Sequence, residues 1–232
     1  YRGVEPGSPA FRKGGYCTQF YPHATFAAMV YRLDVYVGQL VQKLKDKGIY
    51  DNTIIIFASD NGPHREGGAD PDFFNSNGIW RGYKRDLYEG GIRVPMIISW
   101  PGHVQAGTET NFMCSFWDLM PTFEELLNPK AAVKEMDGVS MLPLLENRKG
   151  QKEHEYLYFE FQELNGRQAV RKGSWKLVHM NIRGEKPYYE LYNLAADPSE
   201  KYNLLNKYPE KAEELKAIML EAHTDDPNWP LF

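Results

Sequence analysis

The sequence is poor in the features that mark several protein classes. It holds only two cysteines, Cys17 and Cys114, too few for the disulfide framework of a small secreted scaffold. No apolar run approaches the roughly 18–20 residues that a membrane-spanning helix needs. The 27 Lys and Arg residues are scattered and do not outnumber the 31 Asp and Glu residues, so no basic surface for nucleic acid is indicated. We expect neither a membrane span nor a nucleic-acid partner.

What is present is the composition of a globular protein, and the first half has an α/β pattern. Apolar residues recur every three or four positions between residues 24 and 47, which predicts an amphipathic helix that stops at Gly48. The β-branched block 53–58 follows and is typical of a strand buried on both faces. A second buried strand is predicted at 96–100 and a helix at 115–127. A helix that feeds a buried strand indicates a layered α/β sheet.

The second half has a different pattern. Short aromatic or alternating runs at 156–162, 168–171, 175–180 and 188–194 are separated by Gly or Pro and predict an antiparallel meander. A last helix is expected to start at Pro209 and to end near His223. We therefore predict an α/β portion over 1–128, a connector over 129–153 and a smaller α+β subdomain over 154–232.

The strongest chemical feature follows the first predicted strand. Asp60 and Asn61 lie directly after it, and ligands of open α/β sheets bind beyond the carboxyl ends of strands. A carboxylate and an amide oxygen are hard donors that calcium or magnesium selects. Two donors cannot complete a calcium shell, so any metal needs further ligands. The alternative is an Asx turn followed by Gly62.

A basic, glycine-rich segment lies downstream, at 81–95. Lys84 is suited to oppose an oxyanion as a point charge, and Arg81 is suited to bind one in a bidentate manner. The alternative is a solvated basic loop in which Gly90 and Gly91 only form a tight turn.

Several motifs stand in series along nearly the whole chain. They are Tyr50-Asp51-Asn52-Thr53, Ser59-Asp60-Asn61-Gly62, Arg81-Gly82-Tyr83-Lys84, Glu89-Gly90-Gly91-Ile92-Arg93-Val94-Pro95, Trp100-Pro101-Gly102, Asp118-Leu119-Met120-Pro121-Thr122, Asp137-Gly138-Val139-Ser140, Glu190-Leu191-Tyr192-Asn193-Leu194 and Asp197-Pro198-Ser199-Glu200. In this order they resemble the sulfatase family of the alkaline phosphatase superfamily. The resemblance implies an alkaline-phosphatase-like layered sheet followed by the smaller subdomain.

The resemblance also implies roles for individual residues. Asp60 and Asn61 would be ligands of one calcium ion, and Lys84 would be catalytic and hold a sulfate oxygen. Relatives that act on phosphate commonly have Asp-His at this place, and an amide instead of His favours calcium and sulfate ester chemistry. His64 and Arg81 are candidate substrate-binding residues, although a histidine in a polar loop is as often simply solvated.

Sulfatases of this family use a formylglycine made in a Cys/Ser-x-Pro-x-Arg motif, which neither Cys17 nor Cys114 provides. We therefore expect this chain to resemble only the C-terminal half of a sulfatase. The expected partners are the N-terminal half of the same protein, a sulfated carbohydrate substrate and, for a sheet with an uncovered edge, a second copy. Family resemblance alone implies a periplasmic or secreted location, and the chain by itself is expected to be inactive.

Two other functions remain open at this point. A phosphodiesterase or phosphomutase of the same superfamily would carry His and Asp ligands for two metals upstream. A non-catalytic module would bind glycan through its antiparallel C-terminal unit, because 14% of the residues are aromatic, although aromatics in short strands more often fill a core.

Overall fold

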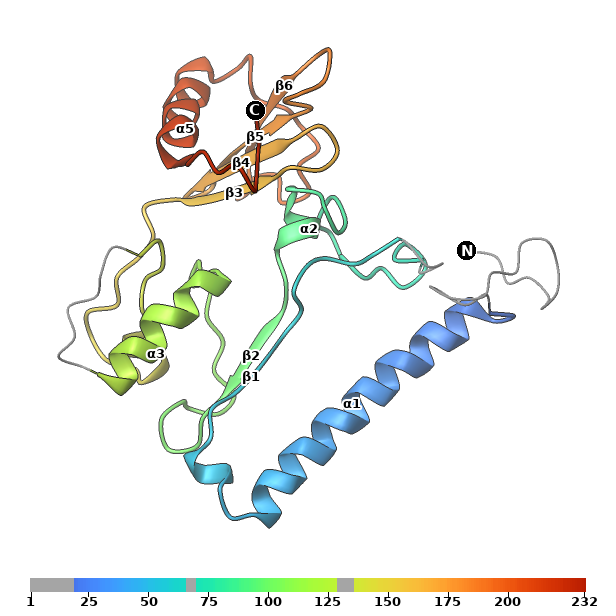
Figure 1. The fold of residues 1–232 in the computed structure, drawn as a ribbon, viewed down its shortest axis with the longest axis vertical. Helices are drawn as coiled ribbons and strands as arrows, with labels where there is room; N and C mark the ends of the chain where they lie inside the picture. The colour runs from blue at the N-terminus through green and yellow to red at the C-terminus, as the bar shows by residue number, and fades with distance from the viewer. Residues whose placement is uncertain (1–18, 66–69, 129–135) are drawn as a thin grey trace.

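The computed structural model describes residues 19–65, 70–128 and 136–232. Figure 1 shows a long helix, a two-stranded ribbon and a four-stranded sheet backed by the last helix. The elements are α1 (Pro22–Asp46), η1 (Tyr50–Asn52), β1 (Ile55–Ala58), α2 (Glu89–Ile92), β2 (Met96–Ser99), η3 (Phe116–Asp118), α3 (Leu119–Leu127), α4 (Leu142–Leu145), β3 (Leu157–Phe161), β4 (Arg167–Lys172), β5 (Trp175–Met180), β6 (Tyr188–Asn193) and α5 (Pro209–Ala222).

Helix α1 confirms the predicted amphipathic helix. Pro22 opens it, where a missing N–H costs nothing, and Gly48 follows its end with a positive φ of 67°. The described chain contacts the apolar stripe only near its start, where the Phe26 ring lies 5.2 Å from the Phe74 ring. No residue of α1 is buried, and Leu40 is 67% exposed. In Figure 1 the helix runs apart from the other elements over most of its length.

Strands β1 and β2 form an antiparallel ribbon in which Ile55 pairs with Ser99 and Ala58 with Met96. Both strands lie where the sequence predicts them. The prediction that they are buried on both faces is wrong for the described chain, since Phe57 is 39% exposed and Ile97 is 63% exposed. The physical reason is that β1 and β2 pair with each other and form a ribbon that, in Figure 1, stands apart from α1 and from the four-stranded sheet.

The C-terminal unit is the predicted meander, with strands in the order β3-β4-β5-β6, each antiparallel to the next. Alternate side chains of these strands serve two separate apolar clusters, as the pleat requires. Val170, Leu177 and Leu191 pack on one face against Leu215 and Met219 of α5. The opposite face is covered by the segment that precedes α2.

That second cluster joins the two halves of the sequence. Leu87 and Tyr88 are buried against Ala169, Val178 and Tyr192 of the sheet. The loop that contains the candidate site is therefore laid on the C-terminal sheet, and its position depends on packing more than 80 residues away in sequence.

Two short helices were not predicted. Helix α2 lies in the glycine-rich segment, and α4 lies within the predicted connector 129–153, of which 129–135 are outside the described residues. Four residues are one helical turn and carry no periodicity to detect. The expected fold class, α/β with a C-terminal antiparallel sheet and terminal helix, is confirmed. The domain boundaries stay a prediction.

Candidate functional site

Two loops meet at the end of β1. The first continues that strand through residues 59–64, and the second comprises residues 81–93. The Gly62 N–H donates to the Gly91 carbonyl at 2.9 Å, and the Lys84 N–H donates to the Pro63 carbonyl at 2.8 Å. The main chain that carries Asp60 is therefore hydrogen-bonded to the main chain that carries Lys84.

Glycines make this contact possible. A Cβ atom on Gly62 would lie 1.8 Å from the carbonyl oxygen of Gly90, and one on Gly90 would lie 2.4 Å from that of Gly82. On Gly91 it would lie 2.1 Å from the Asp86 carbonyl oxygen. No side chain fits at these distances, so the backbones approach only because these positions lack one.

Asp60 and Asn61 offer oxygen atoms at this junction. The Ser59 hydroxyl donates to the Asn61 carbonyl at 2.8 Å, which closes the turn after the strand. The Asn61 side-chain nitrogen donates to the Gly62 carbonyl at 3.1 Å, which leaves its Oδ1 available to accept or to coordinate. The Asp60 side chain is exposed and has no hydrogen-bond or ion-pair partner among the described residues.

This donor set fits part of a calcium site. One carboxylate and one amide oxygen are of the kind that calcium prefers, but its shell takes 6–8 oxygens. In the described part of the chain, no three His, Cys, Asp or Glu side chains gather into a metal-binding group. Two ligands from this chain are consistent with the incomplete shell that the sequence predicts.

Lys84 is the cation beside this loop. Its side chain is half-buried, and within the described ranges it has no ion-pair or hydrogen-bond partner. A lysine that is partly desolvated and not neutralised by a carboxylate keeps its charge available for an anion. His64 follows Pro63, whose carbonyl accepts the Lys84 N–H, so the two side chains start from adjacent backbone.

Arg81 does not join these residues. Its guanidinium donates to the Tyr192 hydroxyl at 2.8 Å, to the Glu200 carbonyl at 2.9 Å and to the Tyr88 hydroxyl at 3.0 Å. It also stacks over the Tyr88 ring at 3.8 Å. Burial lowers the pKa of Arg81, but Tyr88, Tyr192 and Glu190 raise it further, so it stays charged. These contacts fix Arg81 on the C-terminal sheet, and its predicted substrate-binding role stays a prediction.

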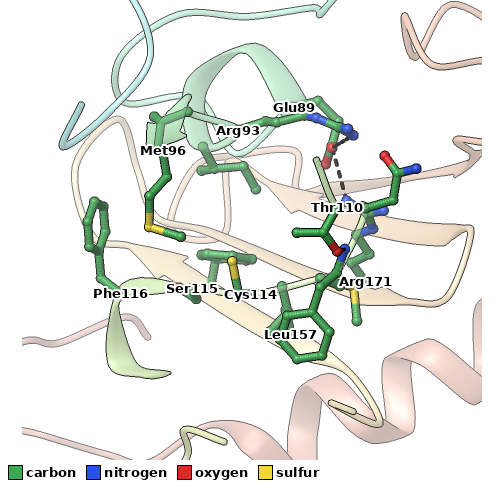
Figure 2. Close-up of a pocket in the computed structure, with 15 residues that line it drawn as sticks. Glu89, Arg93, Met96, Thr110, Cys114, Ser115, Phe116, Leu157 and Arg171 are labelled. Atoms are coloured by element: carbon green, nitrogen blue, oxygen red, sulfur yellow. Dashed lines mark hydrogen bonds and ion pairs between the residues drawn. The ribbon is translucent and has the colours of Figure 1, made fainter. Parts of the chain in front are cut away.

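Sequence reasoning missed a buried ion-pair cluster next to the site. It joins Glu89, the first residue of α2, to Lys176 of β5 and to Glu200. Figure 2 shows Glu89 and Arg171 linked at one end of a cavity of about 310 Å³, otherwise walled by mainly apolar side chains that include Met96, Cys114 and Leu157. The signal in the sequence was a lysine within a mainly apolar strand, between Trp175 and Leu177.

Comparison with known proteins places this geometry in context. Residues 8–129 match the family described as "Sulfatase", and residues 78–225 match "N-sulphoglucosamine sulphohydrolase, C-terminal". The chain is 30% identical to N-acetylgalactosamine-6-O-sulfatase of Bacteroides thetaiotaomicron, over 88% of this chain and 44% of that protein. It is 31% identical to human arylsulfatase A, over 84% of this chain and 42% of that protein.

The chain is also similar in fold to solved structures. The structure of Ps i-CgsB in complex with k-i-k-neocarrahexaose superposes with a TM-score of 0.74 at 32% identity, over 91% of this chain and 46% of that one. A structure described as a complex with its substrate D-glucosamine-2-N,6-O-disulfate gives a TM-score of 0.66 at 26% identity, over 83% and 38%. The chain thus spans less than half the length of the relatives it matches.

Proposed function

Because the chain belongs to the sulfatase family, we propose that it is the C-terminal part of a sulfuric ester hydrolase that carries one side of the active site. One observation carries the proposal. The loop of Asp60 and Asn61 is hydrogen-bonded directly to the loop of Lys84, while the Asp60 and Lys84 charges have no partner in the described chain. Such a pair of groups suits a cation and an anion bound side by side.

Asp60 and the Oδ1 atom of Asn61 would be two ligands of a calcium ion. The remaining ligands, and the formylglycine nucleophile, would come from the part of the protein outside this chain. Bound there, the metal supplies a positive charge that stabilises negative charge on ester oxygens. The proposal does not use the Asn61 side-chain nitrogen, which already donates a hydrogen bond to the Gly62 carbonyl.

Lys84 would hold a sulfate oxygen through its ammonium group. Charge accumulates on the sulfuryl oxygens as the ester bond breaks, and a cation fixed in advance stabilises that charge without reorganising at the moment of reaction. The hydrogen bond from the Lys84 N–H to Pro63 supplies the fixed position. His64 would line the same pocket, and Arg81 would hold the Lys84 loop on the C-terminal sheet through Tyr192.

The substrate class we propose is a sulfated carbohydrate. Relatives named for sulfated amino sugars, and a structure with a bound glucosamine disulfate, support it. We further propose the N-terminal half of the same protein as the partner that completes the site, a second copy as a possible associate, and a periplasmic or secreted location. No described helix is long and apolar enough to cross a membrane.

A Lys84→Ala exchange, made in the protein with the proposed N-terminal half present, tests the anion-binding role. We expect kcat for a sulfated sugar or an aryl sulfate to fall about 100- to 1000-fold, the usual cost of losing one charge-stabilising group. Steady-state kinetics measure it, with the exposed Lys149→Ala as the matched control that keeps the wild-type rate. A Lys84→Ala enzyme as fast as the control would refute the proposed role.

An Asp60→Ala exchange tests the metal site separately from turnover. We expect calcium to bind at least about tenfold more weakly, because a hard cation loses one anionic ligand. Isothermal titration calorimetry of the metal-free protein gives the affinity directly. Asp51→Ala, at an exposed position before β1, is the control and should leave calcium binding unchanged. Equal affinities in both variants would remove Asp60 from the coordination shell.

A further inference from the structure

A buried triangle of charges lies between the C-terminal sheet and the site loops. The Lys176 ammonium lies 3.0 Å from Glu89 Oε1 and 3.0 Å from Glu200 Oε1. The other oxygen of Glu200 accepts the Glu89 backbone N–H at 2.7 Å. Lys176 and Glu200 are 0% exposed, and Glu89 is 2% exposed. Such burial is rare for charged residues unless they are paired. Here Lys176 contacts both carboxylates, and Glu200 also accepts the backbone N–H of Glu89.

The positive and negative charges around the triangle nearly balance. Two carboxylates share the one ammonium, and Arg171 at 3.2 Å and Arg93 at 3.5 Å add positive charge on the outer oxygen of Glu89. Removing one member of a buried pair leaves an uncompensated charge, whereas replacing the whole pair by packed apolar side chains of similar volume is often neutral. A buried pair is thus weak support for stability and stronger support for a defined geometry.

The triangle acts on the backbone beneath the site. Glu89 opens the turn whose next two residues are Gly90 and Gly91. The Gly90 N–H donates to the Arg81 carbonyl at 2.6 Å, and the Gly91 carbonyl accepts the Gly62 N–H at 2.9 Å. One side of this turn therefore supports the loop that leads to Lys84, and the other side supports the loop that contains Asp60.

The sheet also holds the Lys84 loop at two further points. Arg167 of β4 pairs with Asp86 at 2.6 Å and donates to the Arg85 carbonyl at 3.0 Å. Arg81 is held by Tyr192 of β6 and by the Glu200 carbonyl. Lys84 thus lies between two anchored positions, while its own side chain is left without a partner in the described residues.

From these contacts we propose that Lys176 is a positioning residue of the active site, which sets the separation of the Asp60 and Lys84 loops by holding Glu89 against Glu200. It touches neither substrate nor metal. The inference rests on the proposed function, and it gives the C-terminal sheet a part in the reaction rather than only in folding.

The test uses two separate variants, Lys176→Met and Glu200→Gln, each made in the protein with the proposed N-terminal half present. Lys176→Met leaves two carboxylates in a buried site, so it is the harsher change; Glu200→Gln keeps the shape and removes one charge. For both we expect kcat to fall at least about tenfold, a typical cost of a small misplacement, with KM changing less. Calcium affinity, measured by calorimetry, should fall at least about threefold because the Asp60 loop rests on the same turn.

The matched control is Lys172→Met, four residues earlier on the same sheet, where a half-buried lysine pairs with Glu155 and Glu214. It should keep both values. If Lys176→Met does not fold, Glu200→Gln decides: a folded Glu200→Gln enzyme with the wild-type kcat and calcium affinity overturns the inference.

Lys84→Ala separates the positioning role of Lys176 from the proposed function. If it is inactive while Glu200→Gln is normal, only the positioning role fails; if it is fully active, the proposed function fails and this inference with it.

Discussion

Lys84 and Lys176 carry the same ammonium group in opposite surroundings. Lys176 is fully buried between two carboxylates, whereas Lys84 is half-buried with no partner in the described chain. A satisfied charge fixes structure, and an unsatisfied one is available to a ligand. The pairing of each residue, more than its type, separates the group that we assign to substrate from the group that we assign to positioning.

Glu200 gives a pH prediction whose sign follows from its surroundings. Burial raises its pKa above the ordinary value near 4.5, and the Lys176 charge does not fully offset this. The folded chain therefore holds this proton more tightly than the unfolded chain. The stability that it contributes is fully present below the ordinary pKa and is lost as pH rises through the raised one. Glu200→Gln, which mimics the protonated form, should match the wild type in acid and be more stable near neutral pH.

Urea unfolding across the acidic and neutral range measures this difference. Glu89→Gln is the matched comparison with the opposite sign. Burial raises the pKa of Glu89, but Lys176 and Arg171 outweigh it and hold the pKa below its ordinary value. Its contribution is present above the ordinary pKa and is lost as pH falls through the lowered one, so Glu89→Gln should be less stable than the wild type at neutral pH. A Glu200→Gln protein less stable than the wild type at neutral pH would contradict the prediction.

The sequence predicts site residues where the side-chain type itself indicates the chemistry. Asp60, Asn61 and Lys84 stand in motifs, and the structure brings their loops together. Arg81 is predicted to bind substrate because a guanidinium suits an oxyanion. The sequence did not show that Tyr192 and Glu200, more than 100 residues away, would accept its hydrogen bonds. Lys176 was missed for the same reason, since no local pattern shows which distant carboxylates a strand lysine will meet.

At the scale of elements, the glycine contact between the two loops can be tested. Gly62→Ala places a Cβ atom 1.8 Å from the Gly90 carbonyl oxygen, so one loop must move. We expect a loss of about 3 kcal/mol in the free energy of unfolding, the upper range for overpacking, together with loss of activity. Chemical denaturation and steady-state kinetics measure the two effects.

Gly38→Ala is the control, because nothing lies within 4 Å of the added carbon in the middle of α1. Alanine is the better helix former, so this variant should gain up to about 1 kcal/mol. A Gly62→Ala protein with unchanged stability and rate would show that the loops are not held as closely as described.

The long helices and all the strands followed from the sequence, whereas the two one-turn helices did not. Helices α1 and α5 and the four strands of the meander lie within a few residues of their predicted positions, because each carries a full period of its pattern. Helices α2 and α4 have four residues each and depend on tertiary contacts, such as the hydrogen bond from Glu89 to Glu200. The uncovered face of β1 and β2 was also beyond local pattern, since burial depends on what else is folded nearby.

At the scale of the whole molecule, α1 presents an apolar face that the described chain leaves open beyond the contact of Phe26 with Phe74. Met29 is 64% exposed and Leu33 and Leu40 lie further along the same stripe. Contiguous exposed apolar surface of this kind drives association. We expect the isolated chain to self-associate in multi-angle light scattering, and the double exchange Leu33→Lys with Leu40→Lys to shift it towards the monomer. Lysine at Leu127, an exposed position on α3, should leave association unchanged. A monomeric wild-type chain would contradict this.

The contacts of Glu89 with Lys176 and Glu200, which hold the site loop, have a consequence for biosynthesis. Residues 81–93 leave the ribosome about a hundred residues before Glu200, and domains form in the order of their synthesis. The turn at Glu89 therefore lacks its partners Lys176 and Glu200 until β5 and the segment after β6 have emerged. A nascent chain interrupted before residue 200 would carry all the residues that we assign to metal and sulfate, yet the loop that presents them would not be locked in place.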